Sequence, residues 1–69
     1  VRLTAALGEL AHALEDSSPK VRGAAAEALG RLGPAARGAY PALLHVSKSD
    51  PEAGPRNKAS IAAIMVGMP

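Results

Sequence analysis

The chain has 69 residues, a formal net charge of +2 at pH 7, one aromatic residue and no cysteine. A chain of this length buries only about 60% of its unfolded surface, and the lack of cysteine excludes disulfides and thiolate zinc sites. No apolar stretch reaches the roughly 18 residues of a membrane span, so we expect no membrane partner, and the small charge does not indicate nucleic-acid binding by itself.

The first predicted helix runs from about Arg2 to Glu15. Leucines recur along it at spacings of three and four residues and form one apolar stripe: Leu3, Leu7, Leu10 and Leu14. The small polar residues 16–18 then predict a turn, because their side chains can bond the free backbone groups at helix ends.

The second predicted helix has clear start and stop signals. Ser18 is a good N-cap, and Pro19 fits the first helical position, where its missing N–H is no loss. Gly33 and Pro34 predict the end, since glycine accepts the left-handed cap and proline cannot continue a helix. We expect one face to pack against other helices: Val21, Ala25, Ala28, Leu29 and Leu32.

Two further helices are predicted in the second half. The third spans about Ala39 to Lys48, with Leu43, Leu44 and Val46 buried. Gly54-Pro55 interrupts the pattern, so we expect the fourth helix to begin at Pro55 and end near Gly67. From Ala59 this helix is apolar nearly all the way round, which is typical of a helix covered on more than one side. A neighbouring repeat or self-association is therefore expected to use Ile61, Ile64, Met65 and Met68.

The two halves of the chain are copies of one unit. At an offset of 32 positions Leu14 meets Val46 and Pro19 meets Pro51, and after Gly54-Pro55 the offset becomes 34. Repeat one covers about 2–33 and repeat two about 34–67. The alanine-rich composition favours helices stacked on further helices, because alanine permits close approach but buries little area. We therefore expect an all-α fold, an α-solenoid fragment of two helix pairs that belongs to a longer solenoid.

The segment ALEDSSPKVRGAAAEALGRLGPAARGAYPALL resembles the HEAT-like repeats, specifically the short bacterial type found in phycocyanobilin lyase subunits. The resemblance covers most of residues 7–67. It implies structural contacts between neighbouring repeats, pairing Arg22 with Asp50 and directing Asp16 toward a preceding unit. It also implies that the second helix of each pair lines a concave surface, and that the chain is a non-enzymatic scaffold.

On that expected concave surface the candidate partner-binding residues are Lys20, Glu27, Arg31, Arg56 and Lys58. A solvated surface with local ion pairs, such as the favourable i,i+4 spacing of Glu27 and Arg31, is the simplest interpretation. The leading functional hypothesis is docking of a protein partner. The alternative is binding of a nucleic-acid backbone through the basic strip, and a role in a bilin lyase-type protein rests on the resemblance alone.

No catalytic, cofactor-binding or metal-binding residue is predicted, and no cofactor is expected. The only imidazoles are His12 and His45, each in the middle of a predicted helix. His12 and Asp16 share a helix face, but no second histidine lies near enough in sequence to complete a metal site. The motif GRLG closes a helix and opens none, so it is not a phosphate-binding loop. The sequence assigns no cellular location.

Overall fold

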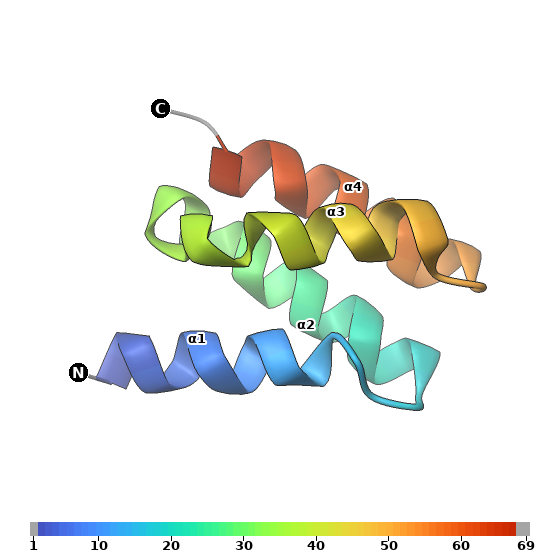
Figure 1. The fold of residues 1–69 in the computed structure, drawn as a ribbon, viewed down its shortest axis with the longest axis horizontal. Helices are drawn as coiled ribbons and strands as arrows, with labels where there is room; N and C mark the ends of the chain where they lie inside the picture. Colours follow the sequence, from blue (N-terminus) through green and yellow to red (C-terminus); the bar gives the residue numbers. More distant parts are fainter. Residues whose placement is uncertain (1, 68–69) are drawn as a thin grey trace.

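The structure is a computed structural model that describes residues 2–67, with side chains described from Ala5 onward. The chain forms two helix pairs, α1–α2 and α3–α4, within extents of 32 × 22 × 16 Å (Figure 1). The elements in chain order are α1 (Arg2–Ala13), α2 (Pro19–Leu32), the 3₁₀ segment η1 (Gly33–Ala39), α3 (Tyr40–Ser49) and α4 (Ala53–Gly67). The predicted all-α solenoid fragment of two helix pairs is confirmed.

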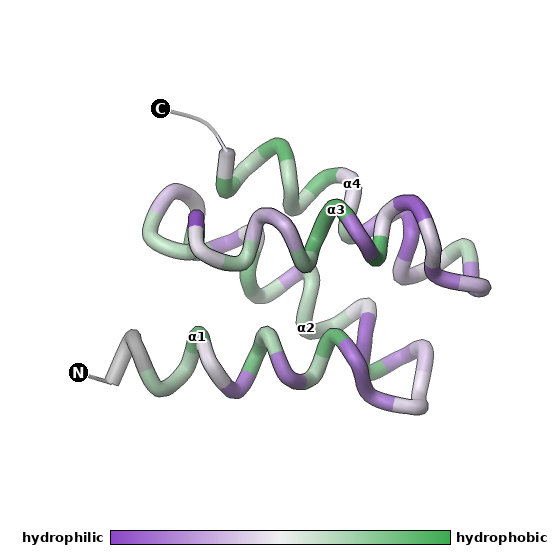
Figure 2. Tube along the Cα trace, viewed as in Figure 1, coloured by the Kyte–Doolittle hydropathy of each residue, from purple (hydrophilic) through white to green (hydrophobic). Residues whose placement is uncertain are grey.

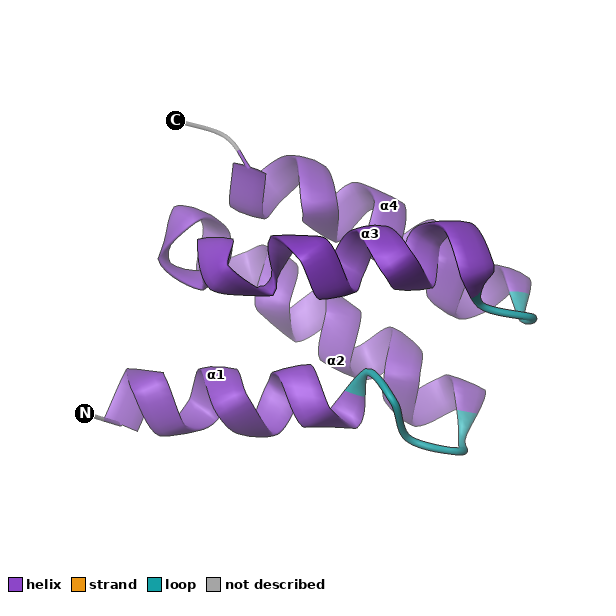
Figure 3. Cartoon of the chain, viewed as in Figure 1, coloured by secondary structure: helices purple, strands orange, loops and turns teal. Residues whose placement is uncertain are grey.

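The two second helices, α2 and α4, pack against each other, and α4 also packs on α3. The loops that join the helices of each pair lie on the same side of the molecule, as Figure 3 shows. Hydrophilic residues gather at these two loops (Figure 2). The second pair therefore repeats the orientation of the first, which is the arrangement that stacked helical repeats require.

The core runs through both pairs and is built mainly from alanine. Its largest fully buried side chains are Leu29 of α2, Leu43 of α3 and Val66 of α4. Glycine brings the second helices close together, because a Cβ at Gly30 would lie 3.1 Å from the Cα and Cβ of Ala62. The small residues at this contact allow closely spaced helices to be stabilised by many short-range contacts.

The predicted boundaries of α2 are confirmed at both ends. The Ser18 hydroxyl accepts a hydrogen bond from the Val21 N–H at 3.3 Å, and Pro19 occupies the first turn. Gly33 ends the helix with φ 61° and ψ −141°, so the positive φ that favours glycine is present while ψ lies outside the left-handed helical region.

The expected start of the fourth helix at Pro55 is wrong, because α4 already begins at Ala53. Pro55 is accommodated in the first turn, where a backbone N–H has no intrahelical acceptor and a proline costs little. The two extra residues of repeat two lie instead at the end of α3, which extends to Ser49. From Asp16 and Asp50 onward, the two repeats are therefore related by 34 positions.

The expected packing of Val21 is also wrong, since this side chain is 40% exposed. Of the other residues on this predicted face, Ala25 and Leu29 are buried and Ala28 and Leu32 are half-buried. In α3, Leu43 and Val46 are buried and Leu44 is half-buried. The side chains of Leu3 and Met68, which we predicted to be apolar contacts, lie outside the described residues.

The connection between the pairs follows the predicted helix end at Gly33 and Pro34 and has helical structure of its own. η1 consists of short 3₁₀ turns joined at Ala36, which has φ −99° and ψ 20°. Ala36 and Ala39 are both buried, and η1 packs on α4. This segment thus contributes to the core that orients the second pair.

Candidate functional site

The best-formed concavity of the described residues is a groove of about 240 Å³ between α2 and α4. Its floor is apolar, and its rim carries charged side chains. The lining residues are Glu27, Gly30 and Arg31 of α2 and Lys58, Ile61, Ala62 and Met65 of α4. The close contact of Gly30 with Ala62 lies at the floor, between the larger side chains of the two helices, and we call this concavity the α2–α4 groove.

The rim charges are linked through one carboxylate. Glu27 accepts a hydrogen bond from Arg31 Nη2 at 3.2 Å and another from Lys58 Nζ at 3.2 Å, one within α2 and one across to α4. All three side chains are close to half exposed or more. Exposed pairs of this kind contribute about 0–1 kcal/mol each, so they can rearrange when a ligand binds. The rim carries a net charge of about +1.

Of the five candidate partner-binding residues, the structure brings Glu27, Arg31 and Lys58 together at this groove. Lys20 is exposed in the first turn of α2 and does not line the groove. Arg56 lies at the other end of α4 from Met65, where its Nη1 donates to the Asp50 carbonyl oxygen at 2.8 Å. The five residues therefore do not form one continuous basic strip.

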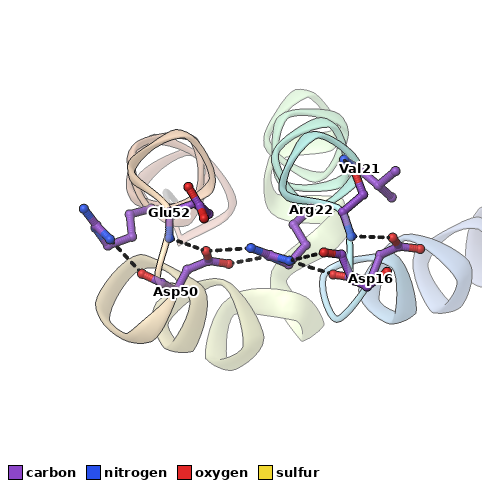
Figure 4. Close-up of polar contacts among 8 residues, drawn as sticks. Asp16, Val21, Arg22, Asp50 and Glu52 are labelled. Carbon is purple, nitrogen blue, oxygen red and sulfur yellow. Dashed lines mark hydrogen bonds and ion pairs between the residues drawn. The ribbon is translucent and has the colours of Figure 1, made fainter.

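This bond of Arg56 to Asp50 continues a row of contacts along the two loops, in which Figure 4 shows Arg22 between Asp16 and Asp50. Arg22 donates from Nε to Asp50 Oδ2 at 2.6 Å and from Nη2 to Asp50 Oδ1 at 3.0 Å. Its third nitrogen, Nη1, donates to the backbone carbonyl oxygens of Asp16 at 2.8 Å and Ser17 at 3.2 Å. One guanidinium thus joins the first loop to the second, and the bidentate geometry is the strong form of this interaction.

The ion pair shifts the pKa of Arg22 and the pKa of Asp50, each in the direction that favours the charged form of the group. The hydrogen bond from Arg22 lowers the pKa of Asp50 despite the opposing effect of burial, and the N–H of Glu52 lowers it further. The hydrogen bond to Asp50 likewise raises the pKa of Arg22. Each partner therefore stabilises the charged form of the other. This contact joins the two repeats, and both of its residues border a second concavity of about 330 Å³ between the loops.

The apolar floor of the groove is the part that sequence reasoning missed. In the sequence analysis Gly30 belongs only to the helix-closing motif GRLG, Ala62 has no assigned role, and Met65 is a contact with a neighbouring repeat, so none was assigned to a binding site. Their convergence depends on how α2 crosses α4. A signal did exist in the small residues at 30 and 62, because small side chains on two helices permit a close approach between them.

The described residues contain no group of three His, Cys, Asp or Glu side chains placed to hold a metal ion. His12 and His45 are both exposed, on α1 and α3 respectively. Within residues 2–67, no helix is long and apolar enough to cross a membrane.

The chain matches the family model described as HEAT repeats over residues 1–64. No curated protein and no solved structure matches it.

Proposed function

This chain belongs to the HEAT repeat family, and from that premise we propose that it is a non-enzymatic docking module whose α2–α4 groove binds a protein partner. HEAT repeats commonly serve as protein-interaction scaffolds. The single observation that carries the proposal is the apolar groove with a charged rim, because protein-binding sites combine an apolar centre with a polar edge.

The shape and chemistry of the groove favour a particular kind of ligand segment. Ile61 and Met65 are exposed to 61% and 39% and flank a floor made of Gly30 and Ala62. One aliphatic or aromatic side chain of a partner can enter this space and displace water from apolar surface. An acidic residue beside that anchor can pair with Arg31 and Lys58. The proposed ligand is therefore a peptide segment with an apolar anchor next to an acidic residue.

The charge distribution gives less support to binding of a nucleic-acid backbone. Arg31 and Lys58 already share the carboxylate of Glu27, and Arg56 is engaged at the loop. A phosphate backbone selects for clustered cations without competing carboxylates. Binding of single-stranded nucleic acid also gains from aromatic side chains on which bases stack, and no aromatic residue lines the groove.

The test is selection of peptides from a displayed random library on the immobilised chain. We expect enrichment of peptides that place a large apolar residue beside Asp or Glu, with affinities measured by titration. Met65→Asp should abolish binding because it places a charge at the apolar wall, and Arg31→Glu should weaken it about tenfold or more.

The matched controls distinguish the groove from the rest of the surface. Lys20→Glu reverses a charge on the same helix outside the groove, so it should leave peptide affinity unchanged. Peptide binding that survives Met65→Asp and Arg31→Glu together would remove the groove from consideration. Duplex or single-stranded oligonucleotides that bind with a steep dependence on salt would support the nucleic-acid alternative instead.

A further inference from the structure

The outer side of α4 presents large aliphatic side chains to solvent. Ile64 is 67% exposed and Ile61 is 61% exposed, whereas the other side of the helix is buried in the core through Ala59, Ala62, Ala63 and Val66. Leaving two large β-branched aliphatic residues exposed on one helix forgoes about 1.5–3 kcal/mol of burial each. This outer side is therefore a packing surface without an occupant among the described residues.

The two loops have the same internal geometry. In the first loop, Asp16 Oδ1 accepts from the Ser18 N–H at 2.9 Å and the Asp16 carbonyl accepts from Arg22 Nη1 at 2.8 Å. In the second loop, Asp50 Oδ1 accepts from the Glu52 N–H at 2.9 Å and its carbonyl accepts from Arg56 Nη1 at 2.8 Å. These two hydrogen bonds correspond atom for atom, whereas the bond from Arg22 Nη1 to the Ser17 carbonyl and the Ser18 cap are found in the first loop.

The two loops also differ in what lies beyond them. Arg22 uses its remaining nitrogens to bind the Asp50 carboxylate, but among residues 2–67 no carboxylate lies within ion-pair distance of Arg56. The Asp16 carboxylate, in turn, accepts no side-chain hydrogen bond from the described residues. One end of the chain thus carries the donor of a third such pair, and the other end carries its acceptor.

We propose that a second copy of this chain stacks head to tail on the outer side of α4, with Asp16 of the second copy bound by Arg56 of the first. The operation that relates repeat one to repeat two, applied once more, places the α1–α2 pair of the second copy beside α3–α4. The two surfaces are different, so the contact does not close and copies can add in series.

The apolar residues that meet in this arrangement fit one another. Inside the chain, Glu27 meets Lys58; the equivalent positions between copies are Ile61 of the first and Ala24 of the second, which are both apolar. Val21 corresponds in the same way to Pro55, which is buried by the preceding repeat. The exposure of Val21, unexplained within one chain, follows if it is covered by another copy.

One position sets the spacing of the contact. Ile64 stands where Gly30 stands in repeat one, and it would face Ala28 of the second copy as Gly30 faces Ala62. The isoleucine prevents an approach as close as that of α2 to α4. The helices of two copies therefore lie further apart than the helices inside one chain, with the isoleucine filling the space between them.

The test is sedimentation equilibrium of the chain across a wide concentration range. We expect the mean mass to rise continuously with concentration, without a plateau at the dimer. Ile64→Asp, at an exposed position that leaves the core intact, should weaken association about tenfold or more. Lys20→Glu is the matched control, because the equivalent Gly54 stays exposed beside the neighbouring repeat, and it should not alter association.

Charge reversal identifies the pair itself. Arg56→Glu and Asp16→Lys should each weaken association about tenfold or more, and an equimolar mixture of the two should recover it. In the mixture, the glutamate introduced by Arg56→Glu faces the lysine introduced by Asp16→Lys. At the next contact, Arg56 of the Asp16→Lys variant faces Asp16 of the Arg56→Glu variant, as in wild type. Circular dichroism of each variant shows whether it is folded. Three results would overturn the proposal. The first is a wild-type chain that stays monomeric at every concentration, and the second is an Ile64→Asp variant that associates like wild type. The third is a mixture of the two charge variants that associates no more strongly than either variant alone.

Discussion

Asp50 joins the second loop to the first through its ion pair with Arg22. It is the one buried charged residue of the described chain, with 8% exposure. Its carboxylate accepts from Arg22 and from the Glu52 N–H, while its carbonyl accepts from Arg56. A carboxylate that is removed from water is stabilised only when such partners are complete, so this position is intolerant of change.

Asp50→Asn should lower the melting temperature by about 5 °C or more. The substitution removes the charge that Arg22 requires while leaving an amide oxygen to cap the loop. Thermal unfolding followed by circular dichroism measures the shift. Asp16→Asn makes the same change in the first loop, where the carboxylate has no partner from the other repeat among the described residues, and it should cost less. Equal losses in both variants would contradict this account of the loops.

The same residue determines the acid sensitivity of the fold. The pKa of Asp50 is lower in the folded chain than its ordinary value of 3.8, so the unfolded chain binds more protons and stability rises with pH. Its contribution is present above about pH 4 and is lost as the pH falls through the lower, folded-state value. Denaturant titrations from about pH 7 to about pH 3 should show a steeper loss for wild type than for Asp50→Asn.

At the scale of the elements, small residues determine how closely α2 and α4 approach. Gly30 is buried, and the nearest atoms to a Cβ placed there belong to Ala62. Gly8, in the middle of α1, has nothing within 4 Å of such a Cβ. These two helical glycines thus differ in packing while sharing the backbone entropy that glycine loses in a helix.

Gly8→Ala should raise the free energy of unfolding by about 0.5–1 kcal/mol, because alanine has the higher helix propensity. Gly30→Ala should lower it, since the obstacle at 3.1 Å is the backbone Cα of Ala62, which moves only if α4 moves. Urea unfolding of the two variants measures the difference. A Gly30→Ala chain as stable as Gly8→Ala would mean that α4 can shift away from α2 at little cost.

At the scale of the whole molecule, the two repeats share one core. The large buried side chains come from both pairs, and η1 packs between them through Ala36 and Ala39. A chain of this size has only a few kcal/mol of net stability, so neither pair is expected to persist when the other unfolds. The two repeats should therefore unfold as one cooperative unit.

Leu29→Ala should lower the free energy of unfolding by about 2–5 kcal/mol, the range for truncating a fully buried leucine, and much of the chain should then be unfolded. Far-ultraviolet circular dichroism detects this as a loss of helicity in both pairs together. Ile64→Ala is the matched control, because the exposed side chain contributes little to the fold of a single copy. Retention of half the helicity in Leu29→Ala would show that the pairs unfold independently.

Features that depend on neighbouring residues in the chain could be determined from the sequence alone. Ser18, Pro19 and Gly33 mark the ends of α2, because a cap acts on backbone groups within one turn. The repeat pattern likewise identified the all-α solenoid architecture and the family. Pro55 shows the limit of such signals, since the same proline interrupts a helix or begins one depending on where the preceding turn starts.

The tertiary structure alone decided which helix faces meet. Apolar periodicity placed Val21 with the core residues of α2, but it cannot tell a side covered within this chain from a side left for another molecule. The groove required Gly30 and Ala62 to be brought together from different repeats. That Arg56 has no carboxylate partner among the described residues became visible only beside the contacts of Arg22. The physical reason is that caps and turns act over a few residues, whereas grooves and inter-repeat ion pairs depend on the relative placement of whole helices.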